Sequence, residues 1–223
     1  MMDGTQHPGS ADTLQTLSSG RDGLERYRIL HDFGQYVLNG VGGDILEIGV
    51  GESSYFLTLL AQKFNRKIYH CDISPSKIIN PMTVPGYLSP KEDIFYQEEK
   101  DETPLYIPQK AICFAGPSDE LFKRFTNLNI GFAFIDGDHN YRQAHRDFWN
   151  LWPFLVDEGV IALHDTYPPD ASWTDENKCG DVYRLRQELE GNPDMEVMTL
   201  GRGCVIGVGV TFVKKKRSGY LYA

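Results

Sequence analysis

Short apolar runs alternate with helical patterns along most of this chain, and this alternation restricts the fold more than any other feature. Each run suits one strand, and the segments between runs place apolar residues at helical spacing. The runs are DILEIGV (44–50), KIYHCDI (67–73), AICFAG (111–116), IGFAFID (130–136) and GVIALHD (159–165); the helical patterns are 22–38, 53–64, 119–125, 141–155 and 180–190. Such alternation predicts an α/β fold with a mainly parallel sheet that is covered on both faces.

The end of the chain departs from this rhythm. Two further strand patterns, 195–200 and 204–213, are separated by the tight sequence GRG. Adjacent strands with so short a connection must run antiparallel. We therefore predict that the sheet ends in an antiparallel hairpin.

The length of 223 residues fits one domain. Residues 1–21 are rich in Gly, Ser, Thr and Asp, which predicts a mobile leader, and we assign 22–223 to a single domain. Residues 74–109 hold six of the 12 prolines and cannot form one long helix, so they are an insertion. A functional lid and a simple mobile insertion both remain open for it.

Charge and composition exclude several classes of partner. The net charge of −9 argues against binding to a nucleic-acid backbone, which requires clustered Lys and Arg. No apolar run approaches the roughly 18 residues that span a bilayer. The four cysteines are widely separated and form no CxxC pair, which favours reduced thiols and a cytoplasmic location. A homo-oligomer is left open.

The first strand pattern ends in a sequence that suits a nucleoside. In EIGVGESS, Gly49 and Gly51 allow a sharp turn and close approach to a ligand, and Asp72 closes the second strand, where an acid can accept hydrogen bonds from ribose. The third glycine of a dinucleotide fingerprint is replaced by Ser54. Ser53 or Ser54 is also a candidate N-cap for the following helix.

The fourth and fifth strand patterns end in ionisable residues. DGDHNY supplies Asp136, Asp138 and His139, and LHDT supplies His164 and Asp165. Neighbouring strand ends that share carboxylates favour a hard divalent ion such as Mg²⁺, whereas two imidazoles with one carboxylate would suit non-haem iron. In a purely structural alternative, the acids cap helices and His164 is a hydrogen-bonded core residue.

LEIGVGESS with the later Asp72 resembles motif I and the second-strand acid of class I S-adenosylmethionine (SAM)-dependent methyltransferases. The resemblance implies a Rossmann-like class I methyltransferase fold with SAM as cofactor. It places Gly49 and Gly51 along the methionine portion, Glu47 near the sulfonium and ammonium groups, and AGPSD (115–119) over adenine, where Ser118 or Asp119 could equally be an N-cap. The implied cofactor-binding set is Glu47, Gly49, Gly51, Ser53, Asp72, Gly116, Ser118 and Asp136.

The combination DGDHxY and HDT resembles the divalent-metal branch of small-molecule O-methyltransferases, including macrolide sugar O-methyltransferases and cephalosporin hydroxylase-like relatives. It implies Asp136 and Asp165 as Mg²⁺ ligands and His139 as general base. His164 stands where those relatives often carry an acid, and we assign it as the third ligand, with Asp138 as second choice.

The expected reaction is methyl transfer to a hydroxyl of a small molecule or natural product. We expect this acceptor to contact the insertion and the segment YPPDASW (167–173). An iron-dependent hydroxylase that uses Asp136, His139 and His164, and a non-catalytic cofactor-binding relative, are the alternatives.

Overall fold

The structure is a computed structural model, and it describes residues 27–79, 90–91, 94–95, 111–175, 177–201 and 208–216. The predicted leader, the start of the first predicted helix, most of the insertion and the last two residues of the GRG turn lie outside these ranges. So does Cys204; Cys71, Cys113 and Cys179 are buried free thiols.

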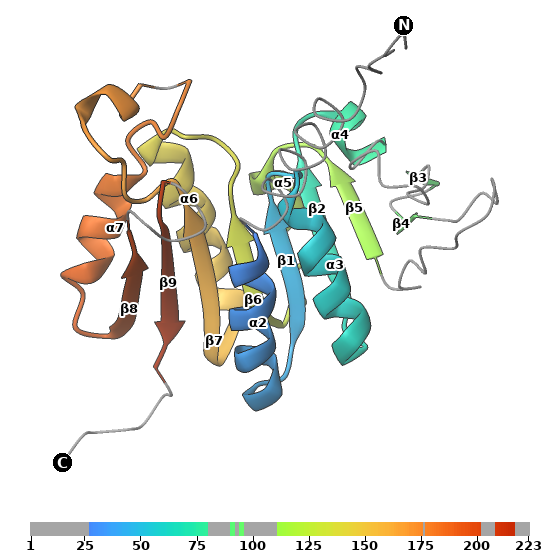
Figure 1. The fold of residues 1–223 in the computed structure, drawn as a ribbon. Helices are drawn as coiled ribbons and strands as arrows, with labels where there is room; N and C mark the ends of the chain where they lie inside the picture. The colour runs from blue at the N-terminus through green and yellow to red at the C-terminus, as the bar shows by residue number, and fades with distance from the viewer. Residues whose placement is uncertain are drawn as a thin grey trace, which may run out of the picture.

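A nine-stranded sheet forms the centre of the molecule, in the order β3-β4-β5-β2-β1-β6-β7-β9-β8 (Figure 1). Its strands are β1 (Asp44–Ile48), β2 (Ile68–Asp72), β3 (Pro90–Lys91), β4 (Ile94–Phe95), β5 (Ala111–Ala115), β6 (Ile130–Ile135), β7 (Leu155–His164), β8 (Met195–Leu200) and β9 (Val210–Lys215). The strands from β5 through β2, β1 and β6 to β7 are parallel. Strand β9 runs antiparallel to both β7 and β8. The predicted mainly parallel sheet with an antiparallel end is confirmed.

Helices cover both faces of this sheet (Figure 1). They are α2 (Arg28–Gly40), α3 (Ser53–Phe64), α4 (Pro75–Ile79), α5 (Ser118–Arg124), α6 (Tyr141–Leu151) and α7 (Tyr183–Glu190), with short 3-10 turns at Trp152–Phe154 and Ala171–Trp173. The apolar sides of α2 and α3 pack on one face, and those of α5, α6 and α7 pack on the other. Strand β6 supplies both cores, because Phe132 and Phe134 point to the first face while Ala133 and Ile135 point to the second. Among the described helices, none is long and apolar enough to cross a membrane.

The predicted helix over 141–155 is too long. Helix α6 ends at Leu151 and a 3-10 turn containing Pro153 follows it. Proline disfavours the helical conformation of the residue before it and lacks an N–H, so a regular helix does not continue there. Strand β7 consequently begins at Leu155, earlier than the apolar pattern indicates.

The predicted serine N-caps are also wrong. Glu52 and Pro117 occupy the N-cap positions of α3 and α5, and neither makes a side-chain cap. The hydroxyl groups of Ser53, Ser54 and Ser118 donate instead to buried carboxylates. A buried carboxylate needs hydrogen-bond donors more than a solvated helix end does, and these serines supply them.

Candidate functional site

The carboxyl ends of β1 and β6 are in direct backbone contact. Gly49 has a φ of +89°, and a Cβ on it would lie 2.0 Å from the carbonyl oxygen of Asp136. The N–H of Asp136 donates to the carbonyl oxygen of Ile48 at 2.8 Å. Only glycine fits at position 49, because both the backbone conformation and the space exclude a side chain.

Glu47 is completely buried beneath the loop that follows β1. Its carboxylate accepts hydrogen bonds from Ser53 Oγ at 2.5 Å and Ser54 Oγ at 2.7 Å, and lies 2.6 Å from His70 Nδ1. Ser54 Oγ also accepts from the N–H of Gly51 at 3.2 Å. The Glu47 carboxylate therefore holds the start of α3 against β1 and β2 from inside the fold.

Asp72 fixes the two loops that follow β1 and β2. Its Oδ2 accepts from the N–H of Val50 at 2.9 Å, and its Oδ1 accepts from the N–H of Ser74 at 2.8 Å. The ammonium group of Lys77 lies 3.3 Å from Oδ2. Asp72 is thus held at the mouth of the strand ends, where it also lines a cavity.

This cavity has a volume of about 380 Å³, within the size range of small-molecule sites. Four predicted cofactor residues line it: Gly49, Asp72, Gly116 and Ser118. Gly51 follows Gly49 closely in the sequence but does not line the cavity. It is exposed, and a Cβ added to it would meet nothing within 4 Å. Glu47, Ser53 and Asp136 do not line the cavity. A larger hollow of about 630 Å³ lies between α2 and strands β7 to β9, and none of the predicted site residues lines it.

Asp147, which the sequence analysis missed, also lines the 380 Å³ cavity and is 1 % exposed. Its Oδ1 accepts hydrogen bonds from Ser118 Oγ and from Gln143 Nε2, the latter at 2.8 Å. Burial raises the pKa of the Asp147 carboxyl to about 6, despite these two hydrogen bonds. The available signal was an acid on the buried face of α6, at helical spacing from Ala144, Phe148 and Leu151.

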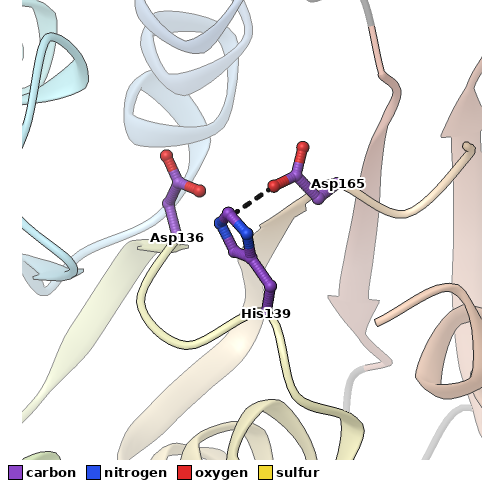
Figure 2. A group of neighbouring side chains, drawn as sticks. All are labelled: Asp136, His139 and Asp165. Atoms are coloured by element: carbon purple, nitrogen blue, oxygen red, sulfur yellow. Dashed lines mark ion pairs between the residues drawn. The ribbon is translucent and has the colours of Figure 1, made fainter. Parts of the chain in front are cut away.

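Asp136, His139 and Asp165 come together beside the ends of β6 and β7 (Figure 2). One ligand atom from each lies within 4.8 Å of the others, and His139 Nε2 is 3.0 Å from Asp165 Oδ2. Asp165 has a left-handed backbone, with a φ of +56°, directly after β7. Aspartate tolerates this conformation better than most residues, and here it turns the chain at the strand end.

His164 does not belong to this group of three. Its Nδ1 lies 3.0 Å from Asp136 Oδ1 and 3.3 Å from Asp165 Oδ1. Burial acts to lower the pKa of His164, but the two carboxylates more than compensate and raise its pKa to about 10. The same contact lowers the pKa of Asp136, against the effect of its burial. His164 Nδ1 therefore contacts both carboxylates, while its Nε2 is buried without a hydrogen-bond partner among the described residues.

The donor set of the group is two carboxylates and one imidazole, which suits a hard divalent ion. An iron site with two imidazoles would require a neutral His164. Cys179 is not part of this group, and burial and the adjacent Asp165 raise the pKa of its thiol to about 12. Asp138 is exposed; its Oδ1 accepts from the N–H of Asn140 at 3.0 Å, and it lines the cavity instead.

The backbone of His139 is fixed by the segment that precedes α7. Gly180 has a φ of +55°, and a Cβ on it would lie 1.8 Å from the carbonyl oxygen of His139. The N–H of Asp181 donates to that oxygen at 3.1 Å, and Asp181 Oδ1 accepts from the N–H of Tyr141 at 2.5 Å. His139 therefore has little freedom to shift relative to this segment.

The raised pKa of Asp147 predicts a pH-dependent cost to stability. Between the unfolded pKa of roughly 4 and the folded pKa of about 6, the native state binds more protons, so stability falls as pH rises. Asp147→Asn should remove this cost, and should stabilise the protein relative to wild type by about 2–3 kcal/mol at pH 8 and little at pH 4.5. Urea unfolding at both pH values measures the difference. An equal effect at both pH values would contradict the assignment.

Comparisons with known proteins agree with this architecture. Residues 46–166 match the family described as "Methyltransferase domain". Among curated protein sequences, none matches the chain significantly.

Several solved structures are similar in fold. An O-methyltransferase from Bacillus cereus in complex with S-adenosylhomocysteine (SAH) is 14% identical in sequence. The match covers 94% of this chain and 92% of the Bacillus cereus chain, with a TM-score of 0.58. The O-methyltransferase TomG from Streptomyces achromogenes, involved in tomaymycin synthesis and in complex with SAM, is 13% identical over 86% of this chain and 80% of its own, with a TM-score of 0.57. An SAH-bound methyltransferase from Podospora anserina is 16% identical over 96% of this chain and 100% of its own, also with a TM-score of 0.57.

The family match spans more than half of the sequence, and these solved structures are similar to the chain in fold. The chain belongs to the methyltransferase-domain family, as a SAM-dependent methyltransferase with the Rossmann-like class I fold.

Proposed function

We propose that this protein transfers the methyl group of SAM to a hydroxyl group of a small molecule, assisted by a divalent cation. The observation that carries the proposal is the contact between Gly49 and Asp136. It joins the edge of the 380 Å³ cavity to the group formed by Asp136, His139 and Asp165. A methyl donor in the cavity and an acceptor at the carboxylates would then be neighbours, as in-line transfer requires.

The cavity residues fit an adenosyl cofactor. Asp72 is held by two backbone amides at the end of β2, where it can accept hydrogen bonds from ribose hydroxyls. The open space at Gly51 leaves room for the methionine portion. SAM would supply an electrophilic methyl group attached to a sulfonium.

The carboxylates of Asp136 and Asp165 fit a hard divalent ion, for which we propose Mg²⁺. Such an ion would stabilise the negative charge that develops on the acceptor oxygen. We assign His139 as the base that takes the proton from the acceptor hydroxyl. Asp165 Oδ2, 3.0 Å from His139 Nε2, would stabilise the resulting imidazolium.

The acceptor side is formed by the segment after β7. Tyr167 and Trp173 are 42% and 38% exposed, and the cation of Lys178 lies 5.3 Å from the centre of the Trp173 ring. Exposed aromatic rings beside the proposed reaction site suit an organic acceptor with an apolar part. The proposal also gains support from TomG, a natural-product O-methyltransferase of similar fold.

Cation dependence is the first expectation. A panel of hydroxylated acceptors is incubated with methyl-labelled SAM, with and without EDTA. Chelation should stop methyl transfer, and added Mg²⁺ or Mn²⁺ should restore it, because the acceptor oxygen loses its charge stabilisation. Calorimetric affinity for SAH should change little. Full activity in EDTA would remove the cation from the mechanism.

His139→Ala separates a base from a metal ligand. If His139 is the base, turnover should fall by about 10²- to 10⁴-fold, and the loss should shrink at high pH, where the acceptor ionises unaided. Metal content, measured after gel filtration in Mn²⁺, should equal that of wild type. A variant that loses its metal would make His139 a ligand, and an undiminished rate would exclude both roles. Asp136→Asn, as the comparison, should lose metal and turnover together.

Gly51→Val tests the cofactor half of the site. The valine side chain meets no protein atom within 4 Å at its Cβ, so the fold should survive while the space for the ligand is filled. SAH binding, followed by calorimetry, should be abolished. Gly42→Val is the matched control, because Gly42 also has open space but precedes β1 at the opposite end of the strand. Unchanged SAH affinity in a folded Gly51→Val variant would remove this loop from the cofactor site.

A further inference from the structure

Only one of the two carboxylate oxygens of Asp147 accepts hydrogen bonds from described residues. Both of its hydrogen bonds, from Ser118 and Gln143, end on Oδ1. Within the part of the chain that the structure describes, no donor faces Oδ2. This oxygen lies 4.0 Å from the position that a Cβ on Gly137 would occupy, and Gly137 and Asp147 both line the 380 Å³ cavity.

The other acids of the cavity do not share this property. Both oxygens of Asp72 accept from backbone amides, as described above. Asp119 accepts from Asn150 on Oδ1 and pairs with Arg146 on Oδ2. Asp138 is exposed, and its Oδ1 accepts from the N–H of Asn140. Of these four carboxylates, only Asp147 has a buried side chain with an oxygen that lacks a donor among the described residues.

The Asp147 side chain is buried, but Oδ2 is not one of the fully enclosed polar atoms without a partner, so this oxygen is accessible from the cavity and a ligand N–H there can donate to it. We propose that Asp147 Oδ2 accepts a hydrogen bond from the exocyclic amino group of the adenine base, and so makes the cavity specific for an aminopurine. This inference rests on the proposed function, because the adenosyl group must occupy the cavity. Ser118 and Gln143 are then positioning residues that hold Oδ1 and leave Oδ2 for the ligand.

The proposal predicts discrimination between two nearly isosteric ligands. S-inosylhomocysteine differs from SAH in carrying a carbonyl oxygen in place of the amino group, and an N1–H in place of the unprotonated N1. Near pH 8 the Asp147 carboxylate is ionised, since its pKa is about 6, and can only accept hydrogen bonds. Two acceptors would then face each other, and a site built for a donor rejects such an analogue strongly.

Asp147→Asn should abolish or reverse the preference for SAH over S-inosylhomocysteine. The amide Oδ1 can still accept from Ser118 and Gln143, while Nδ2 presents a donor to the cavity in place of Oδ2. The variant is expected to fold, because it removes a buried charge. Asp119→Asn is the matched control, since that acid lines the same cavity with both oxygens already engaged.

Calorimetric titration at pH 8 of wild type and both variants, each with SAH and with S-inosylhomocysteine, tests the inference. Wild type and Asp119→Asn should prefer SAH by about 10- to 100-fold, and Asp147→Asn should lose or reverse that preference. Equal weakening of both ligands in Asp147→Asn, or a reversal in Asp119→Asn, would overturn the assignment while leaving the cofactor site intact. Absence of SAH binding to wild type would overturn the cofactor site itself, and this inference with it.

Discussion

The close approach of two strand ends organises this molecule. Gly49 closes β1 so tightly against Asp136 that no side chain could stand between them. The parallel arrangement of β1 and β6 brings their carboxyl ends to one edge, and the glycine lets the two loops touch there. Because Gly49 also lines the 380 Å³ cavity, this backbone contact links the cavity to the group formed by Asp136, His139 and Asp165.

Below that contact, buried polar side chains fix the loops. The carboxylate of Glu47 is hydrogen-bonded to two hydroxyl groups and an imidazole, and that of Asp72 accepts from two backbone amides. Both oxygens of each carboxylate have a donor, as burial of a charge demands. The sequence resemblance assigns Glu47 to the cofactor, yet its side chain is completely buried and does not line the cavity. Its effect on a ligand would pass through Ser53, Ser54 and the glycine loop.

The fold could be predicted from the sequence because it depends on periodicity and strand order, and the residues that close each strand follow from both. Gly49, Asp72, Asp136 and Asp165 lie where the alternating pattern predicts. Side-chain pairing could not be predicted in this way. Ser53 and Ser118 match N-cap positions by pattern but donate to buried acids, and His164 contacts both aspartates while His139 contacts Asp165. Asp147 could not be identified from the ends of the strands, because it lies in the middle of a helix. A charged residue within the apolar stripe of that helix is the feature that could have revealed it.

The packing of Gly180 against the carbonyl oxygen of His139 has a consequence for how such an enzyme could change its acceptor. The segment between β7 and α7 carries the exposed aromatic residues, so new specificity would most simply arise by altering its sequence or length. The same segment holds the backbone of His139 through Gly180 and Asp181. Under the proposed function, acceptor selectivity and proton transfer by His139 would be mechanically linked. A lineage that remodelled this segment would then have to preserve the Gly180 contact or readjust its catalytic rate at the same time.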